Sequence, residues 1–307
     1  MAEGVSATEH RIEFGAEGEP AVSVPIRVYS TGGAASSDIF VWMHGGGFTG
    51  GDLDMPESDW VCRELAARTG RTIIAVDYRL ATPDGPHYPI PSDDVVAVWR
   101  AVTARPAEFA AQPAIATSEV APVPTGGQRR VEHAERIAAV PTPRISIGGA
   151  SAGANLAAGA VFRLRDAALP LPDSVVLVYP TLHADQGPHS ATTLRSLRSM
   201  KLGEQRFEPA AIAAMYGTYI GNEPPFAPSP AVPGLLVPAD FPPTLIVTSD
   251  IDDLRTSGEL FAASLALEGR EVHIVREKGT RHGYLNSPEH PGAELSIARM
   301  AAWLDAP

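Results

Sequence analysis

The segment from Arg144 to Leu156 holds a serine in a setting that suits nucleophilic chemistry. A short apolar run stops at two glycines, Ser151 follows, and an alanine-rich stretch with helical spacing comes next. Residues Gly149 to Gly153 fit the G-x-S-x-G pattern of a nucleophile elbow, in which a strained strand-to-helix turn lifts the serine hydroxyl above the sheet. Glycine and serine are also ordinary turn residues, so the pentapeptide alone is equally compatible with a plain turn.

A serine hydroxyl is a weak nucleophile and needs a base that a third group orients. We assign the base to His282, because the surrounding segment Lys278–Tyr284 is expected to be a flexible loop after the last strand, where a movable acid–base group belongs. The remaining histidines outside the glycine-rich segment described below are expected to be surface or packing residues: His10, His87, His133, His183, His189, His273 and His290.

Three aspartates compete for the role of the orienting carboxylate. Asp250, Asp252 and Asp253 all follow the strand expected before the last one. We favour Asp252 and rank Asp250 second, although one of the three could instead cap a helix that begins near Leu254. The order of serine, aspartate and histidine along the chain is that of α/β-hydrolases, and it differs from the orders in chymotrypsin and subtilisin.

Acyl transfer also requires N–H donors aimed at the oxyanion that develops during the reaction. The sequence His44-Gly45-Gly46-Gly47 follows an apolar run, and its N–H groups can turn into a concavity that no side chain obstructs. We predict that Gly46, Gly47 and the N–H of Ala152 form this oxyanion hole. Ala152 also opens a helix whose dipole favours negative charge there. His44 is expected to brace the loop by hydrogen bonding and to transfer no proton.

Composition limits the classes of partner. The chain has 307 residues and a formal net charge of −12, which argues against nucleic acid or an anionic membrane as the main partner. The single cysteine, Cys62, permits no intramolecular disulfide and no cysteine-based metal site, and we expect it to be buried in a helix. Met1 to Ser6 do not resemble a signal peptide, and no apolar run is long enough to cross a membrane, so we expect a cytoplasmic protein.

Apolar strands alternate with helices along the chain, which predicts an α/β fold: one domain over residues 1–307 with a mostly parallel, doubly wound sheet. We expect an antiparallel pair of strands within 10–30, a strand before the elbow, and further strands at 39–43, 72–76, 175–179, 244–248 and 272–275. Helices are expected at 57–69, after an N-cap at Ser92, at 132–139, after the elbow, and at 208–220, 255–268 and 292–304.

Two stretches interrupt this alternation. Residues 181–240 have few strand signals and are too long for a simple crossover, so we predict a cap inserted over the strand ends, after the elbow helix and the strand that follows it. Residues 105–128 are dominated by Ala, Pro, Thr and Gly and are predicted to form a mobile surface loop. In doubly wound sheets ligands bind at the carboxyl ends of the strands, and each chemical motif above falls at such an end.

The chain resembles the bacterial hormone-sensitive-lipase-like esterases, a family of α/β-hydrolases. The resemblance runs from about residue 22 onward and is carried by His44–Phe48, Asp77–Ala81, Gly149–Leu156, Asp252–Arg255 and His282–Tyr284. It implies hydrolysis of short- to medium-chain acyl esters without a cofactor or a metal. It also implies Ser151 as nucleophile, Asp252 as orienter and His282 as base, and it supports the oxyanion hole proposed above.

The sequence departs from this family in three places. Ala150 stands where many relatives have an acidic or hydroxyl residue, so any polar contact made there is missing. The segment before His44 leaves little chain for the N-terminal cap helices of relatives, and the loop at 105–128 is longer than usual. These departures concern the range of substrates more than the chemistry.

Other functions stay open on the sequence alone. A lactonase, an amidase or an acyltransferase could use the same triad, because the pocket walls drawn from 181–240 would decide between them. A small-molecule-binding protein on a hydrolase scaffold that has lost its activity is disfavoured, since both Ser151 and His282 are present. A homodimer through the last strand or the C-terminal helix is compatible with the sequence, but no residue demands it.

Overall fold

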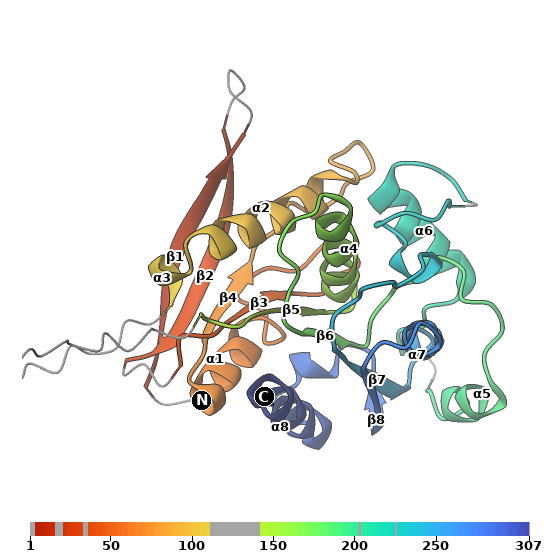
Figure 1. Cartoon of the computed structure of the whole chain (residues 1–307). Coiled ribbons are helices and arrows are strands. Elements are labelled where there is room, and N and C mark those ends of the chain that lie inside the picture. Colours follow the sequence, from red (N-terminus) through yellow and green to blue (C-terminus); the bar gives the residue numbers. More distant parts are fainter. Residues whose placement is uncertain are drawn as a thin grey trace, which may run out of the picture.

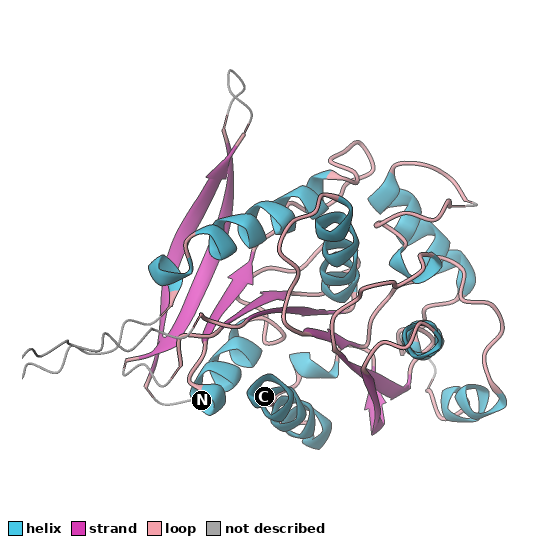
Figure 2. Ribbon diagram, in the orientation of Figure 1, coloured by secondary structure: helices cyan, strands magenta, loops and turns pink. Residues whose placement is uncertain are grey.

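An eight-stranded sheet runs through the protein (Figures 1 and 2). The computed structural model describes residues 4–15, 21–32, 36–110, 142–201, 204–224 and 226–306. Across the sheet, the strands follow the order β1 (Val5–Phe14), β2 (Val22–Thr31), β4 (Thr72–Val76), β3 (Ile39–Met43), β5 (Ile145–Ala150), β6 (Val175–Val178), β7 (Thr244–Ile251) and β8 (Val272–Arg281). Strands β1 and β2 are antiparallel to their neighbours, and the ladder from β4 to β8 is parallel. The predicted doubly wound sheet is confirmed.

Helices cover both faces of this sheet. The core on one face includes side chains of α2 (Ile90–Ala104), α4 (Ala152–Asp166) and α7 (Arg255–Leu267), and the core on the other includes α1 (Asp59–Thr69) and α8 (Pro291–Asp305). Figure 1 shows α2 and α4 on the side of the sheet opposite to α1 and α8. All residues of β3, β4, β5 and β6 are buried, because these strands are covered on both faces. Such strands are mostly apolar, and Thr72 and Ser146 are the polar residues among them.

Residues 181–240 contain the helices α5 (Ala191–Leu197) and α6 (Pro209–Ile220) and the 3-10 turn η1 (Pro233–Leu235). Helix α6 packs on the loop that follows β3, where the rings of Phe48 and Tyr219 stack with their centroids 3.9 Å apart. This contact brings part of the segment to the carboxyl end of β3. Helix α6 therefore lies beside the strand ends at which the active site is expected.

Several expectations about the bounds and caps of elements need correction. Ser92 does not cap α2, because the helix already begins at Ile90, and the Ser92 hydroxyl instead accepts a hydrogen bond from Arg163 at 2.8 Å. Strand β8 extends to Arg281 through pairing with β7, so much of the loop expected before His282 is strand.

Part of the loop expected at 105–128 is a short helix, α3 (Pro106–Phe109). Residues 111–141, which include the rest of that loop and the helix expected at 132–139, lie outside the described residues. Where the structure describes the chain, none of its helices combines the length and apolar character needed to cross a membrane.

Candidate active site

Ser151 sits at the apex of a sharp turn between β5 and α4. Its backbone angles are φ 53° and ψ −115°, an unfavourable conformation for a residue with a side chain. The Ser151 N–H donates to the carbonyl of Val178 at 2.9 Å, which holds the turn on β6. A Cβ atom added at Gly149 would lie 2.4 Å from the carbonyl carbon of Gly153, and one added at Gly153 would lie 2.2 Å from the Met43 oxygen. The turn therefore requires both glycines, as the elbow pattern predicts.

The side chains of Ser151, His282 and Asp252 form a continuous chain of hydrogen bonds. The distance from Ser151 Oγ to His282 Nε2 is 2.8 Å, and the distance from His282 Nδ1 to Asp252 Oδ2 is also 2.8 Å. Asp252 has no exposed side-chain surface, and its other oxygen accepts the N–H of Leu254 at 2.9 Å. The structure thus brings together the three residues expected to act as nucleophile, base and orienter, from the ends of β5, β8 and β7.

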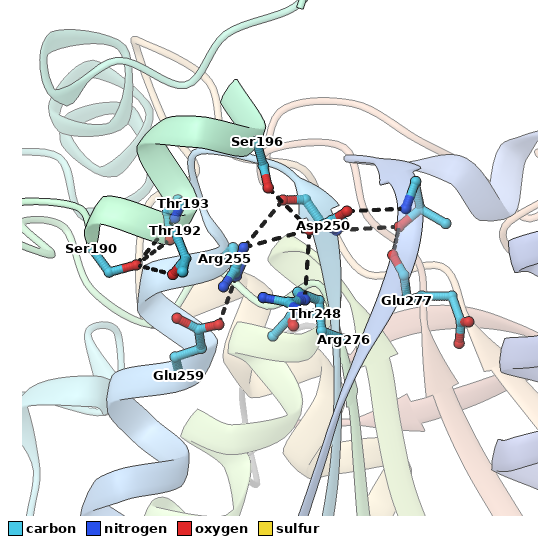
Figure 3. Close-up of polar contacts among 12 residues, drawn as sticks. Ser190, Thr192, Thr193, Ser196, Thr248, Asp250, Arg255, Glu259, Arg276 and Glu277 are labelled. Carbon is cyan, nitrogen blue, oxygen red and sulfur yellow. Dashed lines mark hydrogen bonds and ion pairs between the residues drawn. The ribbon is translucent and has the colours of Figure 1, made fainter. Parts of the chain in front are cut away.

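Asp250, the second choice for the orienter, binds Ser196, Arg255 and Arg276 (Figure 3). Its carboxylate accepts hydrogen bonds from the Ser196 hydroxyl at 3.1 Å and from the Gly279 N–H at 3.2 Å. It also lies 3.6 Å from the guanidinium groups of Arg255 and Arg276. Asp250 therefore joins α5 and α7 to the end of β8, a structural role.

The N–H groups of Gly46, Gly47 and Ala152 are free to face a ligand. Gly46 and Gly47 have φ angles of 119° and 61°, conformations that favour glycine, and both line the same cavity as Ser151. Ala152 is the first residue of α4. None of these three N–H groups donates a hydrogen bond to a residue that the structure describes.

His44 braces the glycine loop, as expected. Its Nδ1 lies 2.6 Å from the carbonyl oxygen of Gly45, its ring stacks on Tyr78 with centroids 4.5 Å apart, and the Tyr78 hydroxyl donates to the His44 carbonyl at 2.8 Å. Burial lowers the pKa of His44 below its ordinary value. A neutral, buried imidazole packed in this way supports the loop and is poorly placed to exchange protons.

A cavity of about 640 Å³ opens above the serine. Ser151 and His282 form part of its wall together with the two glycines. Residues from 181–240 supply another part of the wall: Gln205, Phe207, Ala214, Met215 and Thr218. Phe207 also contacts His282, with ring centroids 4.6 Å apart. The segment predicted to be a cap therefore shapes the space in which a substrate would bind.

The charges around His282 favour the imidazolium, in which both ring nitrogens carry a proton. Burial alone would lower the pKa of His282, but the negative charge of Asp252 and the hydrogen bond to it raise the pKa, with a smaller contribution from Glu57, and the net effect is an increase. A stabilised imidazolium suits a base that must hold a proton during a reaction. Within the described part of the chain, no cluster of three or more His, Cys, Asp or Glu side chains could hold a metal ion.

Glu57 also belongs to this site, although its sequence context did not predict a role for it. It was expected to lie in the helix 57–69, but α1 begins at Asp59 and Glu57 lies in the preceding turn. Its side chain is buried, lines the cavity of Ser151 and accepts a hydrogen bond from the Gly45 N–H at 2.6 Å. An acidic residue before a helix is ordinary, so the sequence held no signal that separates this glutamate from a helix-dipole partner.

Comparison with known proteins identifies the family of this chain. Residues 40–286 match a family described as alpha/beta hydrolase fold. The chain is 30% identical over 271 residues to the esterase LipI of Mycobacterium tuberculosis, a match that covers 87% of this chain and 72% of LipI. It is 28% identical over 268 residues to carboxylesterase NlhH of the same species, covering 86% of this chain and 72% of NlhH.

A solved structure shows the same architecture. The crystal structure of esterase LipW from Mycobacterium marinum has a TM-score of 0.72 at 27% sequence identity, and the match covers 98% of this chain and 81% of that one. The family match spans most of the sheet and all the segments that build the site. The chain belongs to the α/β-hydrolase family, in the branch of the hormone-sensitive-lipase-like esterases that its motifs indicated.

Proposed function

We propose that this protein is a serine carboxylesterase that hydrolyses short- to medium-chain acyl esters through an acyl-enzyme. The observation that carries the proposal is the hydrogen-bonded chain from Asp252 through His282 to Ser151, which faces the same cavity as Gly46 and Gly47. The names of its relatives, esterase LipI and carboxylesterase NlhH, support the same class of reaction.

In the first half of the proposed reaction, Ser151 Oγ attacks the ester carbonyl carbon while His282 Nε2 takes the hydroxyl proton. The N–H groups of Gly46, Gly47 and Ala152 donate to the oxyanion of the tetrahedral intermediate. Asp252 holds the imidazole in the required tautomer and stabilises the imidazolium. When the intermediate collapses, the bond to the leaving alcohol breaks and His282 returns the proton to that alcohol.

In the second half, a water molecule replaces the alcohol. His282 takes a proton from the water as its oxygen attacks the acyl carbon of the ester on Ser151. Collapse of the second intermediate breaks the bond to Ser151 Oγ, which regains its proton from His282, and the carboxylic acid leaves. Water is the only co-substrate, and neither half requires a cofactor.

Residues 181–240 act in this proposal as a cap that selects the substrate, since Phe207 and Met215 line the cavity from this segment. The cap gives no specific support for a lactone, an amide or an acyl acceptor other than water, so the ester stays the favoured substrate. A single domain over the whole chain, a cytoplasmic location and a homodimer stay predictions from the sequence.

The test is hydrolysis of p-nitrophenyl butyrate by the full chain and by Ser151→Ala. We expect turnover by the wild type and a loss of at least about 10³-fold in the variant, together with stoichiometric fluorophosphonate labelling of Ser151 only in the wild type. Ser146→Ala is the matched control, because Ser146 is a buried serine of β5, the strand that leads to Ser151, and its hydroxyl pairs with that of Ser174 at 2.9 Å. Wild-type protein that neither turns over esters nor takes the label would refute the proposal.

A further inference from the structure

Glu57 is a buried acid beside the nucleophile for which the proposed reaction has no use. Its residue is 2% exposed, and it shares the lining of one cavity with Ser151 and His282. Its side-chain partners among the described residues are Gly45, Tyr179 and Asn286, none of which is a cation. Burial of a carboxylate that no cation contacts costs several kcal/mol, and the positive charge that acts on Glu57 from this site is that of His282. Its presence here therefore points to a function more than to stability.

Every partner of the Glu57 carboxylate is a donor. The Gly45 N–H donates to Oε1 at 2.6 Å, and the Tyr179 hydroxyl and the Asn286 amide, the latter at 3.4 Å, donate to Oε2. The Asn286 amide orientation is fixed, because its oxygen accepts the Glu57 N–H at 3.2 Å. Burial raises the pKa of Glu57, and the hydrogen bonds from Tyr179 and Gly45 limit that rise. Both oxygens thus accept, as those of an ionised carboxylate do.

The Gly45 peptide links Glu57 to the oxyanion donors. Gly45 directly precedes Gly46 and Gly47 in the chain. A Cβ atom added at Gly45 would lie 2.4 Å from Glu57 Oε1 and 3.1 Å from Ser151 Cβ, so carboxylate, glycine and serine are in direct contact. A shift of this peptide would therefore move the Gly46 and Gly47 donors relative to Ser151.

No other side chain of the described elbow can take over this task. Ala150, the residue before the serine, is fully buried and has no polar side-chain atom. The acceptor for the Gly45 N–H comes instead from the turn between β3 and α1. The same carboxylate binds Tyr179, whose ring lies 5.0 Å from that of His282. Glu57 thus holds both the glycine loop and the tyrosine that packs against the ring of His282.

We propose that Glu57 is a positioning residue for the oxyanion hole, whose carboxylate fixes the Gly45 peptide and thereby aims the Gly46 and Gly47 N–H groups at the developing oxyanion. This inference rests on the proposed esterase function. It assigns no proton transfer to Glu57, and its effect is exerted through the glycine loop.

The experiment compares Glu57→Leu, which removes both acceptors in a similar volume, with Glu57→Gln, which keeps one acceptor. We expect kcat per active site to fall about 10- to 100-fold in Glu57→Leu with KM within about twofold, because the oxyanion forms only in the transition state. Glu57→Gln should recover part of the loss. Affinity for a trifluoromethyl ketone, which forms an oxyanion on Ser151, should fall by the same factor as kcat/KM, and active sites are counted by fluorophosphonate titration.

Glu277→Leu is the matched control for the removal of a buried carboxylate. Glu277 is 4% exposed on β8, accepts a hydrogen bond from Arg299 at 3.1 Å and lies outside the cavity. This control should lose stability and keep kcat and KM per active site.

Two results would overturn the inference: a kcat within twofold of wild type in Glu57→Leu, or a change confined to KM. If Glu57→Leu does not fold, Glu57→Gln decides. We then expect kcat to fall roughly 3- to 10-fold, and an unchanged kcat would overturn the proposal. Wild-type protein without turnover or label marks the failure of the esterase function itself, which is distinguishable from a failure confined to Glu57.

Discussion

The carboxylate of Asp253 accepts two hydrogen bonds from the guanidinium of Arg206, both at 2.8 Å. Arg206 belongs to the segment 181–240, and Asp253 directly follows Asp252 at the end of β7. The adjacent Phe207 donates its N–H to Asp253 at 2.9 Å and contacts His282 with its ring. Two consecutive aspartates thus hold different partners: one orients the base, and the other anchors the proposed cap next to it.

Arg206→Ala is expected to loosen this anchor and to destabilise the fold. Burial raises the pKa of Asp253, but Arg206 and the Phe207 N–H lower it below its ordinary value, so the folded state favours the carboxylate. The Arg206 side chain is 40% exposed, and solvent screening limits the expected loss to about 1–2 kcal/mol at pH 7.

The pH dependence of that loss has a definite sign. A depressed carboxyl pKa contributes stability above the unfolded value of about 3.9, and this contribution disappears as the pH falls through the folded value. The difference between wild type and Arg206→Ala in urea unfolding should therefore shrink below about pH 4. Arg276→Ala is the control, because Asp250 keeps Arg255 as a partner. A constant difference from pH 7 to pH 3 would contradict the assignment.

The acidic limb of the pH–rate profile should reflect His282. Only the neutral imidazole can accept the serine proton, and the pKa of His282 is raised, so kcat/KM should rise with pH to half its maximum above about pH 6.5. Asp252→Asn removes the charge that raises this pKa. In this variant the limb should move to lower pH, and the maximal kcat/KM should fall by about 10³- to 10⁴-fold. An unmoved limb would assign the titration to another group.

Gly153→Ala should prevent normal folding even though alanine favours helices over glycine by about 1 kcal/mol. The added Cβ would lie 2.2 Å from the Met43 carbonyl oxygen, and backbone cannot yield as a flexible side chain does. We expect destabilisation of about 3 kcal/mol or more by thermal unfolding, or no folded protein. Gly32→Ala, with nothing within 4 Å of the added Cβ, should change stability by less than about 0.5 kcal/mol.

Met215 is expected to limit the length of the acyl chain. Its sulfur lies 3.4 Å from the position of a Cβ atom on Gly47, so the side chain forms the cavity wall beside the oxyanion donors. Met215→Ala should raise kcat/KM for p-nitrophenyl decanoate relative to the acetate by roughly tenfold. A series of p-nitrophenyl esters from two to ten carbons measures this change. An unaltered profile would place the acyl chain elsewhere in the cavity.

The sequence predicted the centre of the fold better than its edges. Runs that are apolar except for Thr72 identified β3 and β4 residue for residue, since strands covered on both faces are mostly apolar. Strand β8 was predicted to end at Val275 because Arg276 to Arg281 contain no apolar side chain. They are strand only because β7 pairs with them, which is a non-local cause.

The site shows the same division. Motif and chain order were enough to select Ser151 and His282, which the structure joins by a hydrogen bond. The three aspartates could be ranked but not separated by local pattern, because their partners come from other elements. Glu57 could not be predicted for the same reason. Its role depends on hydrogen bonds from Gly45 and from Tyr179, which is 122 residues away in the sequence.

The hydrogen bond between Ser151 and His282 spans 131 residues of sequence and joins an inner strand to the edge of the sheet. Among the strands that the structure describes, β8 is hydrogen-bonded to β7 alone, whereas β5 lies between β3 and β6. Fraying of the outer strand on heating would carry His282 away from an elbow that is still intact. On heating, loss of turnover should thus precede loss of bulk secondary structure. Enzyme activity would then report the local stability of the β8 edge of the sheet.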